Sequence, residues 1–285
     1  MFIEYTAQYA DWIGRSESVT DNLDPWRAQA AAAMFDREAL LSEAGSELPA
    51  LWHWFFFLAT SPQTQLSDDG HPQRGGFMPP VTLPRRMFAG SRMTFHRLLR
   101  LGQPAVRHAQ IRDVRQKSGR SGELVFVTVD YQYTQGGELC IEEQQDIVYR
   151  EPGEPVPAPV VASLPRAPED CWSRDVRADS RLLFRFSALT FNAHRIHYDR
   201  SYAAEVEGYP GLVVHGPLTA MLLADLITQN TRQPIATFSF RGVAPLFDLF
   251  PFRLMGRHSS GNVELEAVGP DGGKVITATA ALKED

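Results

Sequence analysis

The segment PLTAMLLADLITQ, from Pro217 to Gln229, constrains the fold more than any other part of the chain. Its spacing predicts a helix with apolar side chains on nearly every side, and Asp225 is the main exception. Such a helix has to be covered on nearly every side. Strand-like runs follow it at Ile235–Val243, Phe252–Arg257, Val263–Val268 and Val275–Leu282. We therefore expect an antiparallel sheet that curls around a buried helix, which is an α+β architecture.

The first half of the chain has the same order of elements. Asp24 and Pro25 have the form of an N-cap followed by proline at the first helical position, so a helix begins there. A second helix is predicted over the apolar stretch Glu47–Ala59. Runs rich in β-branched and aromatic residues then predict strands at Ala105–Gln116, Leu124–Thr134 and Leu139–Tyr149. A shorter run, Leu182–Phe186, predicts the strand that opens the second half.

A proline-rich stretch separates the two halves. Glu151–Asp170 contains six prolines, which fix φ and remove backbone donors, so it forms neither a central strand nor a helix. It predicts a semi-rigid, extended linker. We therefore expect a first domain over residues 1–150, a linker over residues 151–170 and a second domain over residues 171–285, each domain of ordinary size.

Composition limits the partners and the compartment that we expect. The formal net charge of -6 argues against nucleic-acid binding, which needs a basic surface. The longest apolar run, Leu51–Thr60, is about half of what a membrane span requires, so no membrane segment is expected. The N-terminus lacks the features of a signal peptide. Cys140 and Cys171 have no metal-binding spacing and fit a reducing, cytoplasmic compartment.

Histidines cluster in two neighbouring segments of the second half. FSALTFNAHRIHYD contains Asn192, His194 and His197, and VVHGPL then adds His215. Histidine titrates nearest to neutral pH, and a neutral imidazole in position can take a proton from water. An asparagine can orient that water but cannot accept its proton. The pattern therefore predicts a catalytic site for proton transfer.

Gly216 and Pro217 predict the start of the buried helix. Pro217 suits the first helical position, where its missing N–H is not needed. The first N–H groups of a helix have no partner within the helix and, with the helix dipole, favour negative charge. Gly216 lets a ligand approach the backbone closely. A thioester carbonyl placed there would have its developing enolate oxygen stabilised.

A metal site is the alternative use of these histidines. Zinc ligands could come from His194, His197, His215 and Asp199. The HxxH spacing on a short loop is a weak signal, however. The chain contains neither the HExxH motif of metalloproteases nor the GxSxG motif of nucleophilic hydrolases. We therefore expect no metal and no cofactor.

The two histidine segments resemble the MaoC-type enoyl-thioester hydratases of the hot-dog fold. They are most similar to the branch that contains hydroxyacyl-thioester dehydratase type 2 and the mesaconyl-C4-CoA and itaconyl-CoA hydratases. The resemblance extends into the first half through IGRSESVTD, LPALWHWFFF and GGFMPPVTLPRRMFAG. It implies a double hot-dog, with two helix-wrapped antiparallel sheets in one chain and a catalytic loop in the second half alone.

The resemblance also implies roles for individual residues. The family motif has an aspartate, an asparagine two residues later and a histidine five residues after the aspartate. His197 matches that histidine, and Gly216 matches the residue whose N–H lines the oxyanion hole. Asn192 stands in place of the aspartate, and His194 in place of the asparagine. His197 is therefore expected to carry most of the proton transfer.

The implied substrate is an acyl-CoA thioester with a second carboxylate. The branch hydrates itaconyl-CoA or mesaconyl-C4-CoA to citramalyl-CoA, and a guanidinium would bind the free carboxylate. The substrate-binding residues that we expect are His215, Pro217, Arg185 and Arg195. Arg85, Arg86 and Arg241 are further candidates for the carboxylate.

Other activities on the same fold remain open. The chain could be a 3-hydroxyacyl-thioester dehydratase of fatty-acid metabolism, or a thioester-binding module without activity. It could also be an acyl-CoA thioesterase, which would need a carboxylate near the start of the buried helix. Asp225 is about two turns into that helix and is poorly placed for this role. Because hot-dog sheets commonly pair edge to edge, the resemblance also implies a homodimer.

Overall fold

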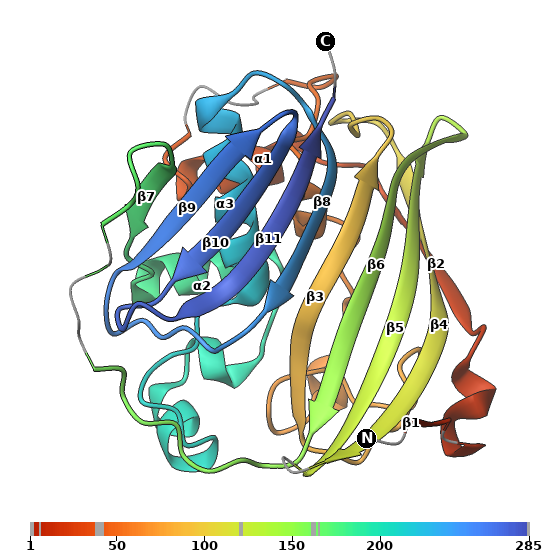
Figure 1. Ribbon diagram of the computed structural model, residues 1–285. Coiled ribbons are helices and arrows are strands. Elements are labelled where there is room, and N and C mark those ends of the chain that lie inside the picture. The colour runs from red at the N-terminus through yellow and green to blue at the C-terminus, as the bar shows by residue number, and fades with distance from the viewer. Residues whose placement is uncertain are drawn as a thin grey trace.

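The strands of the protein form one antiparallel sheet. The computed structural model describes residues 3–5, 7–37, 43–119, 122–160, 164 and 166–283. The sheet has the order β1-β4-β5-β6-β3-β8-β11-β10-β9-β7, and β2 also pairs with β4. The α-helices lie together on one side of this sheet, behind it in Figure 1.

The elements have the following bounds. The strands are β1 (Ile3–Tyr5), β2 (Ser16–Asp21), β3 (Arg85–Phe95), β4 (Ala105–Gly119), β5 (Gly122–Gln135), β6 (Glu138–Arg150), β7 (Trp172–Val176), β8 (Ile235–Gly242), β9 (Phe252–Ser259), β10 (Asn262–Val268) and β11 (Lys274–Leu282). The α-helices are α1 (Pro25–Met34), α2 (Ser180–Leu189) and α3 (Gly216–Asn230). Short 3-10 helices span Ala7–Trp12, Trp52–Phe55, Gln63–Gln65 and Arg195–His197, and a π-helical turn spans Tyr202–Val206.

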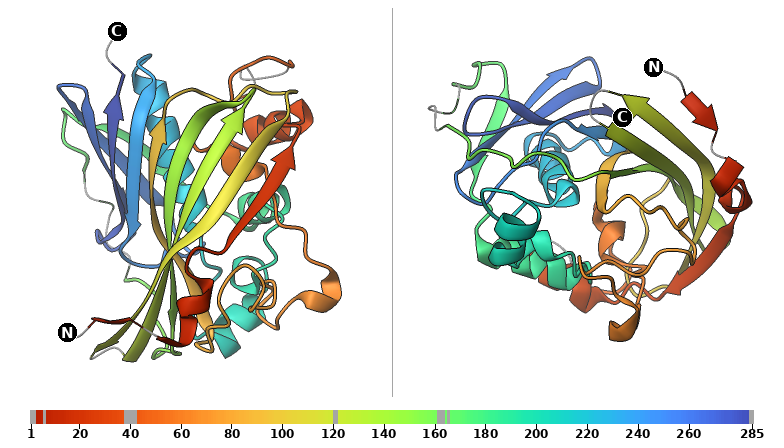
Figure 2. Two further views of the ribbon diagram at one scale, coloured as in Figure 1. Left: turned by 90° about the vertical axis from the view of Figure 1, so that its right-hand side faces the viewer. Right: turned by 90° about the horizontal axis from the view of Figure 1, so that it is seen from below.

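The sheet consists of two similar halves that meet at β3 and β8. These strands pair from Gly90 opposite Arg241 to Thr94 opposite Thr237. Moving outward from the joint, β6, β5, β4 and β2 follow on one side, and β11, β10, β9 and β7 on the other. Both half-sheets curve toward the helices, as the end-on view in Figure 2 shows. The expected α+β double hot-dog is confirmed by this arrangement.

The helix α3 occupies the inner face of the second half-sheet. It contacts β7, β8, β9, β10 and β11. Its apolar residues from Leu218 to Ile227 are buried, so the predicted all-round burial is confirmed. Asp225 is the exception here too, and its carboxylate binds Arg174 (2.7 Å) and Arg37 (3.2 Å). An Asp24 N-cap also begins α1 as predicted.

Two sequence predictions of local structure are wrong. The helix expected over Glu47–Ala59 is reduced to the single 3-10 turn Trp52–Phe55, because Leu51 has a left-handed φ of 70° and the chain is extended again at Phe56. The strand expected at Leu182–Phe186 is part of the helix α2. The carboxylate of Asp179 accepts hydrogen bonds from the backbone N–H groups of Arg181 and Leu182, so it caps α2.

One strand has no counterpart among the sequence predictions. β3 follows Pro84 and begins with two arginines, so neither its flanks nor its first residues signal a strand. The described residues of Glu151–Asp170 form no helix or strand, as expected of a linker, and the division into domains at this stretch stays a prediction. No helix in the described part of the chain is long and apolar enough to cross a membrane.

Candidate active site

A cavity of about 720 Å³ opens where the two halves meet. The second half lines it with the loop after α2 and with the start of α3. The first half contributes residues of β3 and β6 and the turn around His71. Asn192, His194, His197 and Gly216 all line this cavity, so the structure brings the predicted catalytic residues together.

The loop that carries the histidines is held by its own backbone. The Asn192 N–H donates to the Ser187 carbonyl at the end of α2 (2.8 Å). The Asn192 side-chain Oδ1 then accepts the backbone N–H of His194 (2.9 Å). The 3-10 turn Arg195–His197 follows directly. Asn192 therefore fixes the loop with its oxygen, and its side-chain Nδ2 has no acceptor among the residues that the structure describes.

His197 is held in one orientation. It is buried, and its Nδ1 lies 2.7 Å from the carbonyl oxygen of Val213. Since a carbonyl only accepts, Nδ1 carries the proton and Nε2 keeps its lone pair. Burial lowers the pKa of His197 to about 4, although the bond to Val213 acts in the opposite direction. The ring is therefore neutral at neutral pH and can accept a proton at Nε2.

His194 and His215 flank His197. The His215 ring stacks on that of His197 with 3.6 Å between centroids, and the His194 ring lies 5.3 Å from it. His215 Nε2 is hydrogen-bonded to the hydroxyl of Ser187 (2.9 Å). Burial lowers the pKa of His194 to about 2, and that of His215 well below its ordinary value. This row of buried imidazoles is uncharged in the resting protein.

The backbone N–H of Gly216 faces open space. The first hydrogen bond of α3 runs from the Thr219 N–H to the His215 carbonyl (3.1 Å). Among the described residues, none accepts from the Gly216 N–H. A Cβ added at Gly216 would lie 4.0 Å from its nearest neighbour, the Phe88 carbonyl oxygen. With Pro217 behind it at the helix start, this N–H can receive an oxyanion.

The first half adds an acidic residue and a histidine that sequence reasoning missed. Asp69 and His71 lie on the turn between Leu66 and Pro72, and the His71 ring is 4.1 Å from that of His194. The Asp69 carboxylate accepts both the backbone N–H (2.9 Å) and the Nδ1–H (3.0 Å) of His71. The sequence SDDGH at this position is typical of a turn and indicates nothing more. More than 120 residues separate it from the catalytic loop, so no local pattern links the two.

Asp69 and His71, together with His194, are also the side chains of the site that could bind a metal ion. One ligand atom from each of Asp69, His71 and His194 lies within 4.8 Å of the others. Both oxygens of Asp69 already bind His71, however, so the cluster is a hydrogen-bonded pair beside a third imidazole. The zinc set considered from sequence is not assembled, because the Asp199 carboxylate binds Arg195 (2.8 Å) and does not line the cavity.

The arginines differ in how they are used. Arg86 lines the cavity, and its guanidinium has no hydrogen bond or ion pair with any residue that the structure describes. Its neighbour Arg85 also lines the cavity but binds Glu207 through Nε (2.8 Å) and Nη2 (2.6 Å). Burial lowers the pKa of His71, and the positive charge of Arg86 lowers that pKa further. The cavity therefore holds a free guanidinium close to the imidazoles.

The structure does not bring the other candidate arginines to the cavity. Arg195 pairs with Asp199, and its guanidinium stacks on the Tyr202 ring at 4.1 Å. Arg185 is exposed on α2, and Arg241 is exposed on β8. None of these three lines the cavity. Of the arginines considered from sequence, Arg85 and Arg86 are therefore the ones that line the cavity.

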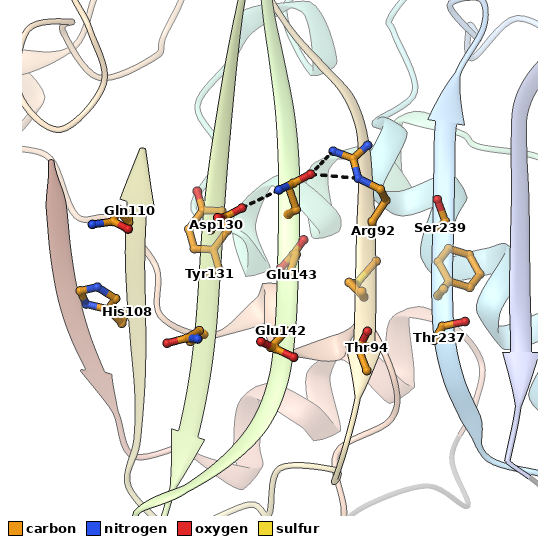
Figure 3. Close-up of a pocket in the computed structure, with 14 residues that line it drawn as sticks. Arg92, Thr94, His108, Gln110, Asp130, Tyr131, Glu142, Glu143, Thr237 and Ser239 are labelled. Carbon is orange, nitrogen blue, oxygen red and sulfur yellow. Dashed lines mark hydrogen bonds between the residues drawn. The ribbon is translucent and has the colours of Figure 1, made fainter. Parts of the chain in front are cut away.

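A second hollow, of about 530 Å³, lies on the face of the sheet that points away from the helices. Figure 3 shows its row of polar side chains across β5, β6 and β3. Arg92 donates to Gln144 Oε1 (2.6 Å), and Gln144 Nε2 donates to Asp130 (2.7 Å). Because these groups bind one another, and because His194, His197 and His215 line the hollow between the halves, that hollow is the candidate active site.

Neutral imidazoles and an unpaired backbone N–H at the start of a helix face the same cavity. This combination is typical of an enzyme that transfers protons and stabilises a negatively charged oxygen. The family model described as hydroxyacyl-thioester dehydratase type 2 matches residues 51–248, and the chain belongs to this family. Mesaconyl-C4-CoA hydratase of Chloroflexus aurantiacus is 60% identical over 277 residues, which are 97% of this chain and 99% of that protein.

Solved structures agree on the fold. A MaoC-like dehydratase superposes with a TM-score of 0.72 at 16% identity, covering 98% of this chain and all (100%) of the other. A Mycobacterium tuberculosis protein described as having a double hot-dog fold superposes with a TM-score of 0.56 at 14% identity, covering 95% of this chain and 96% of the other. The double hot-dog prediction is thus confirmed by comparison as well as by topology.

Proposed function

We propose that this protein is an enoyl-CoA hydratase that adds water to a short dicarboxyl enoyl-CoA, with mesaconyl-C4-CoA or itaconyl-CoA as substrate and citramalyl-CoA as product. The observation that carries the proposal is the 60% identity to mesaconyl-C4-CoA hydratase over nearly the whole of both chains. As a member of its family the protein is a hydro-lyase.

The free guanidinium in the cavity supports a dicarboxyl substrate. A short unsaturated acyl group without a second carboxylate would leave Arg86 without an anion in a partly buried site. A dicarboxyl substrate supplies that anion, and a guanidinium binds a carboxylate through two parallel hydrogen bonds. Arg86 is therefore the residue that we assign to the free carboxylate.

The thioester carbonyl is assigned to the start of α3. Its oxygen would accept the Gly216 N–H, beside Pro217 and at the positive end of the helix dipole. This bond strengthens as the oxygen gains charge, so it withdraws electrons from the double bond and makes the β-carbon electrophilic. Losing one such donor typically costs about 2.7–4 kcal/mol of barrier.

The water is assigned to the loop. His197 presents Nε2 as an acceptor, and Asn192 presents its side-chain Nδ2 as a donor. As the water oxygen bonds to the β-carbon, a proton leaves it for an imidazole, and the α-carbon then receives a proton. His194 and His215 keep His197 in place by ring contact. Positioned acid–base catalysis of this kind contributes about 10²–10⁴-fold.

The alternatives are weaker on this geometry. A thioesterase needs a carboxylate near the helix start to activate water, but Asp225 is bound by Arg174 and Arg37 and does not line the cavity. A fatty-acyl dehydratase would share the imidazoles and Gly216, so Arg86 is the residue that separates it from a dicarboxyl-CoA hydratase.

The proposal extends to the setting of the enzyme. The free thiols of Cys140 and Cys171 support a reducing, cytoplasmic compartment. The chain would act as a homodimer in the degradation of itaconate or other C5 dicarboxylates. The first half, without a catalytic loop of its own, would shape the acyl pocket.

The proposed function is tested with purified protein and three thioesters in parallel: mesaconyl-C4-CoA, itaconyl-CoA and crotonyl-CoA. Mass spectrometry follows the addition of water, and a thiol reagent follows free CoA. Water addition to the dicarboxyl substrates, with little on crotonyl-CoA, is expected. Hydration of crotonyl-CoA alone would indicate a fatty-acyl dehydratase, and release of CoA thiol would indicate a thioesterase.

A further inference from the structure

The turn that carries Asp69 and His71 is built onto the catalytic loop. The Arg195 N–H donates to the Asp69 carbonyl (2.9 Å), which ties the turn to the 3-10 helix of His197. Gly70 between them has a φ of +90°, and a Cβ there would lie 1.8 Å from the Ala193 carbonyl oxygen. Only glycine permits such close packing of two backbones, so the position of His71 beside His194 is fixed.

The hydrogen bonds of the pair decide which nitrogen of His71 carries the proton. Although burial raises the pKa of Asp69, the hydrogen bonds from His71 hold that pKa well below its usual range. The carboxylate is therefore ionised and can only accept. It accepts from Nδ1, so Nε2 of His71 has a lone pair, as Nε2 of His197 does.

Asp69 is also the carboxylate that the cavity has available. Among the described residues that line it, the acidic ones are Asp69 and Glu207. Glu207 is already neutralised by Arg85 at 2.8 Å. On the catalytic loop itself Asn192 lines the cavity, and its neutral amide supplies no charge to balance an imidazolium. A proton accepted by His197 would create a buried cation without a partner, which is costly.

We propose that His71, with Asp69 behind it, is the second acid–base group of this site, so that the first half of the chain supplies a charge that the catalytic loop does not contribute to the cavity. One water is held by the Nε2 lone pairs of His197 and His71. Its oxygen bonds to the β-carbon while its proton moves to His71 Nε2, and Asp69 stabilises the imidazolium. The same proton then moves from Nε2 to the α-carbon, which leaves His71 neutral again. This inference rests on the proposed hydratase activity.

The inference is tested with two substitutions and a matched control. In His71→Gln the acceptor nitrogen is lost, and kcat for water addition should fall about 10²–10⁴-fold. In Asp69→Asn the new amide donates to Nδ1, which moves the proton to Nε2, and kcat should again fall, by less. Asp68→Asn is the control, because its exposed side chain lies on the same turn and has no hydrogen bond to any described residue.

Nuclear magnetic resonance gives a readout that does not depend on activity. In protein labelled with ¹⁵N-histidine, His71 should be the Nδ1–H tautomer in the wild type and in Asp68→Asn, and the Nε2–H tautomer in Asp69→Asn. Thermal unfolding shows whether each variant is folded. If His71→Gln does not fold, Asp69→Asn decides, because its side chain can still accept the backbone N–H of His71.

The outcomes separate this inference from the proposed function. Wild-type protein that hydrates none of the thioesters defeats the proposed function and the inference with it. Wild-type activity that persists in folded His71→Gln and Asp69→Asn defeats the inference alone. An Nε2–H tautomer of His71 in the wild type, or a tightly bound stoichiometric metal that His71→Gln releases, would also overturn it, because the lone pair would then be in use.

Discussion

The two halves of the molecule each bury a histidine close to the cavity, and they treat it in opposite ways. In the first half His53 is 1% exposed, and its Nε2 lies 3.1 Å from the carboxylate of Glu143. In the second half His197 is also buried, but its Nδ1 binds a neutral carbonyl, and no carboxylate of the described residues is hydrogen-bonded to its ring. The Nε2 of His53 is therefore engaged by a carboxylate, whereas the Nε2 of His197 keeps its lone pair for a molecule in the cavity.

The surroundings of Glu143 explain why the first-half histidine is structural. Its carboxylate also accepts hydrogen bonds from Trp54, Ser91, Tyr133 and Gln145. Burial raises the pKa of Glu143, but the hydrogen bonds from His53, Gln145 and Ser91 outweigh burial and hold the pKa below its usual value. With every lone pair engaged, the network joins the turn Trp52–Phe55 to β3, β5 and β6 and stabilises the core of the first half.

The contrast predicts first that His197 matters for rate and little for folding. His197→Gln removes the Nε2 acceptor, and we expect kcat for water addition to fall about 10²–10⁴-fold. The far-ultraviolet circular dichroism spectrum should not change. His96→Gln is the matched control, because His96 is an exposed histidine that pairs with Glu142. Full activity in folded His197→Gln would remove His197 from the mechanism.

Glu143 should show the reverse, a loss of stability. Glu143→Ala leaves the donors of His53, Trp54 and Tyr133 buried without an acceptor, and breaking a buried charged network typically costs about 3–5 kcal/mol. Urea denaturation measures the free energy of unfolding. Glu142→Ala, on the same strand but exposed, should cost little, because exposed ion pairs contribute little. Equal losses in both variants would contradict the assignment.

Arg86 should affect the choice of substrate. Hydrogen bonds to charged groups contribute about 1.5–3 kcal/mol, so Arg86→Gln should lower kcat/KM for mesaconyl-C4-CoA roughly 10- to 100-fold. Crotonyl-CoA has no second carboxylate and should be unaffected. Arg241→Gln serves as the control, because Arg241 is exposed and outside the cavity. A similar loss on both substrates would mean that Arg86 does not bind the free carboxylate.

The pH dependence of stability should carry the signature of the unpaired histidine. The pKa of His197 is about 4 when folded, against an ordinary 6.5. Above pH 6.5 the ring is neutral in both states and contributes nothing. As the pH falls from 6.5 to about 4, the unfolded chain binds the proton first, so stability decreases by about 1.4 kcal/mol per pH unit for this residue. Urea denaturation across that range gives the free energy of unfolding at each pH. Its slope against pH should be shallower for His197→Gln than for the wild type, and identical slopes would contradict the lowered pKa of His197.

Much of the fold could be predicted from periodicity and turn residues. Eight strands were predicted. Seven of them match β4, β5, β6, β8, β9, β10 and β11, and the eighth, Leu182–Phe186, is part of a helix. The failures have local causes. A short apolar run such as Leu182–Phe186 fits a strand or a helix equally well, and only the Asp179 cap decides. β3 was missed because Pro84 and two arginines precede its apolar part.

The residues of the candidate site also fall into those that the sequence predicted and those that only the structure identified. Asn192, His194, His197 and Gly216 were found because they lie within 25 residues of one another in two compact motifs. Arg86 was one of several arginines until the structure placed it in the cavity and left Arg185 and Arg195 outside. Asp69 and His71 gave no signal, because a turn with aspartates and glycine is common in loops of every kind.

The sequence by itself determined the buried helix α3, the strands that wrap it and the imidazole loop beside its first residue, because these depend on spacings along the chain. The tertiary structure decided which charges meet. It paired His53 with Glu143, left His197 without a carboxylate, and set Asp69 and His71 against His194 through a glycine with no room for a side chain. Charges interact through space and not along the chain, so only the folded molecule could show where the proton-transfer groups of the two halves come together.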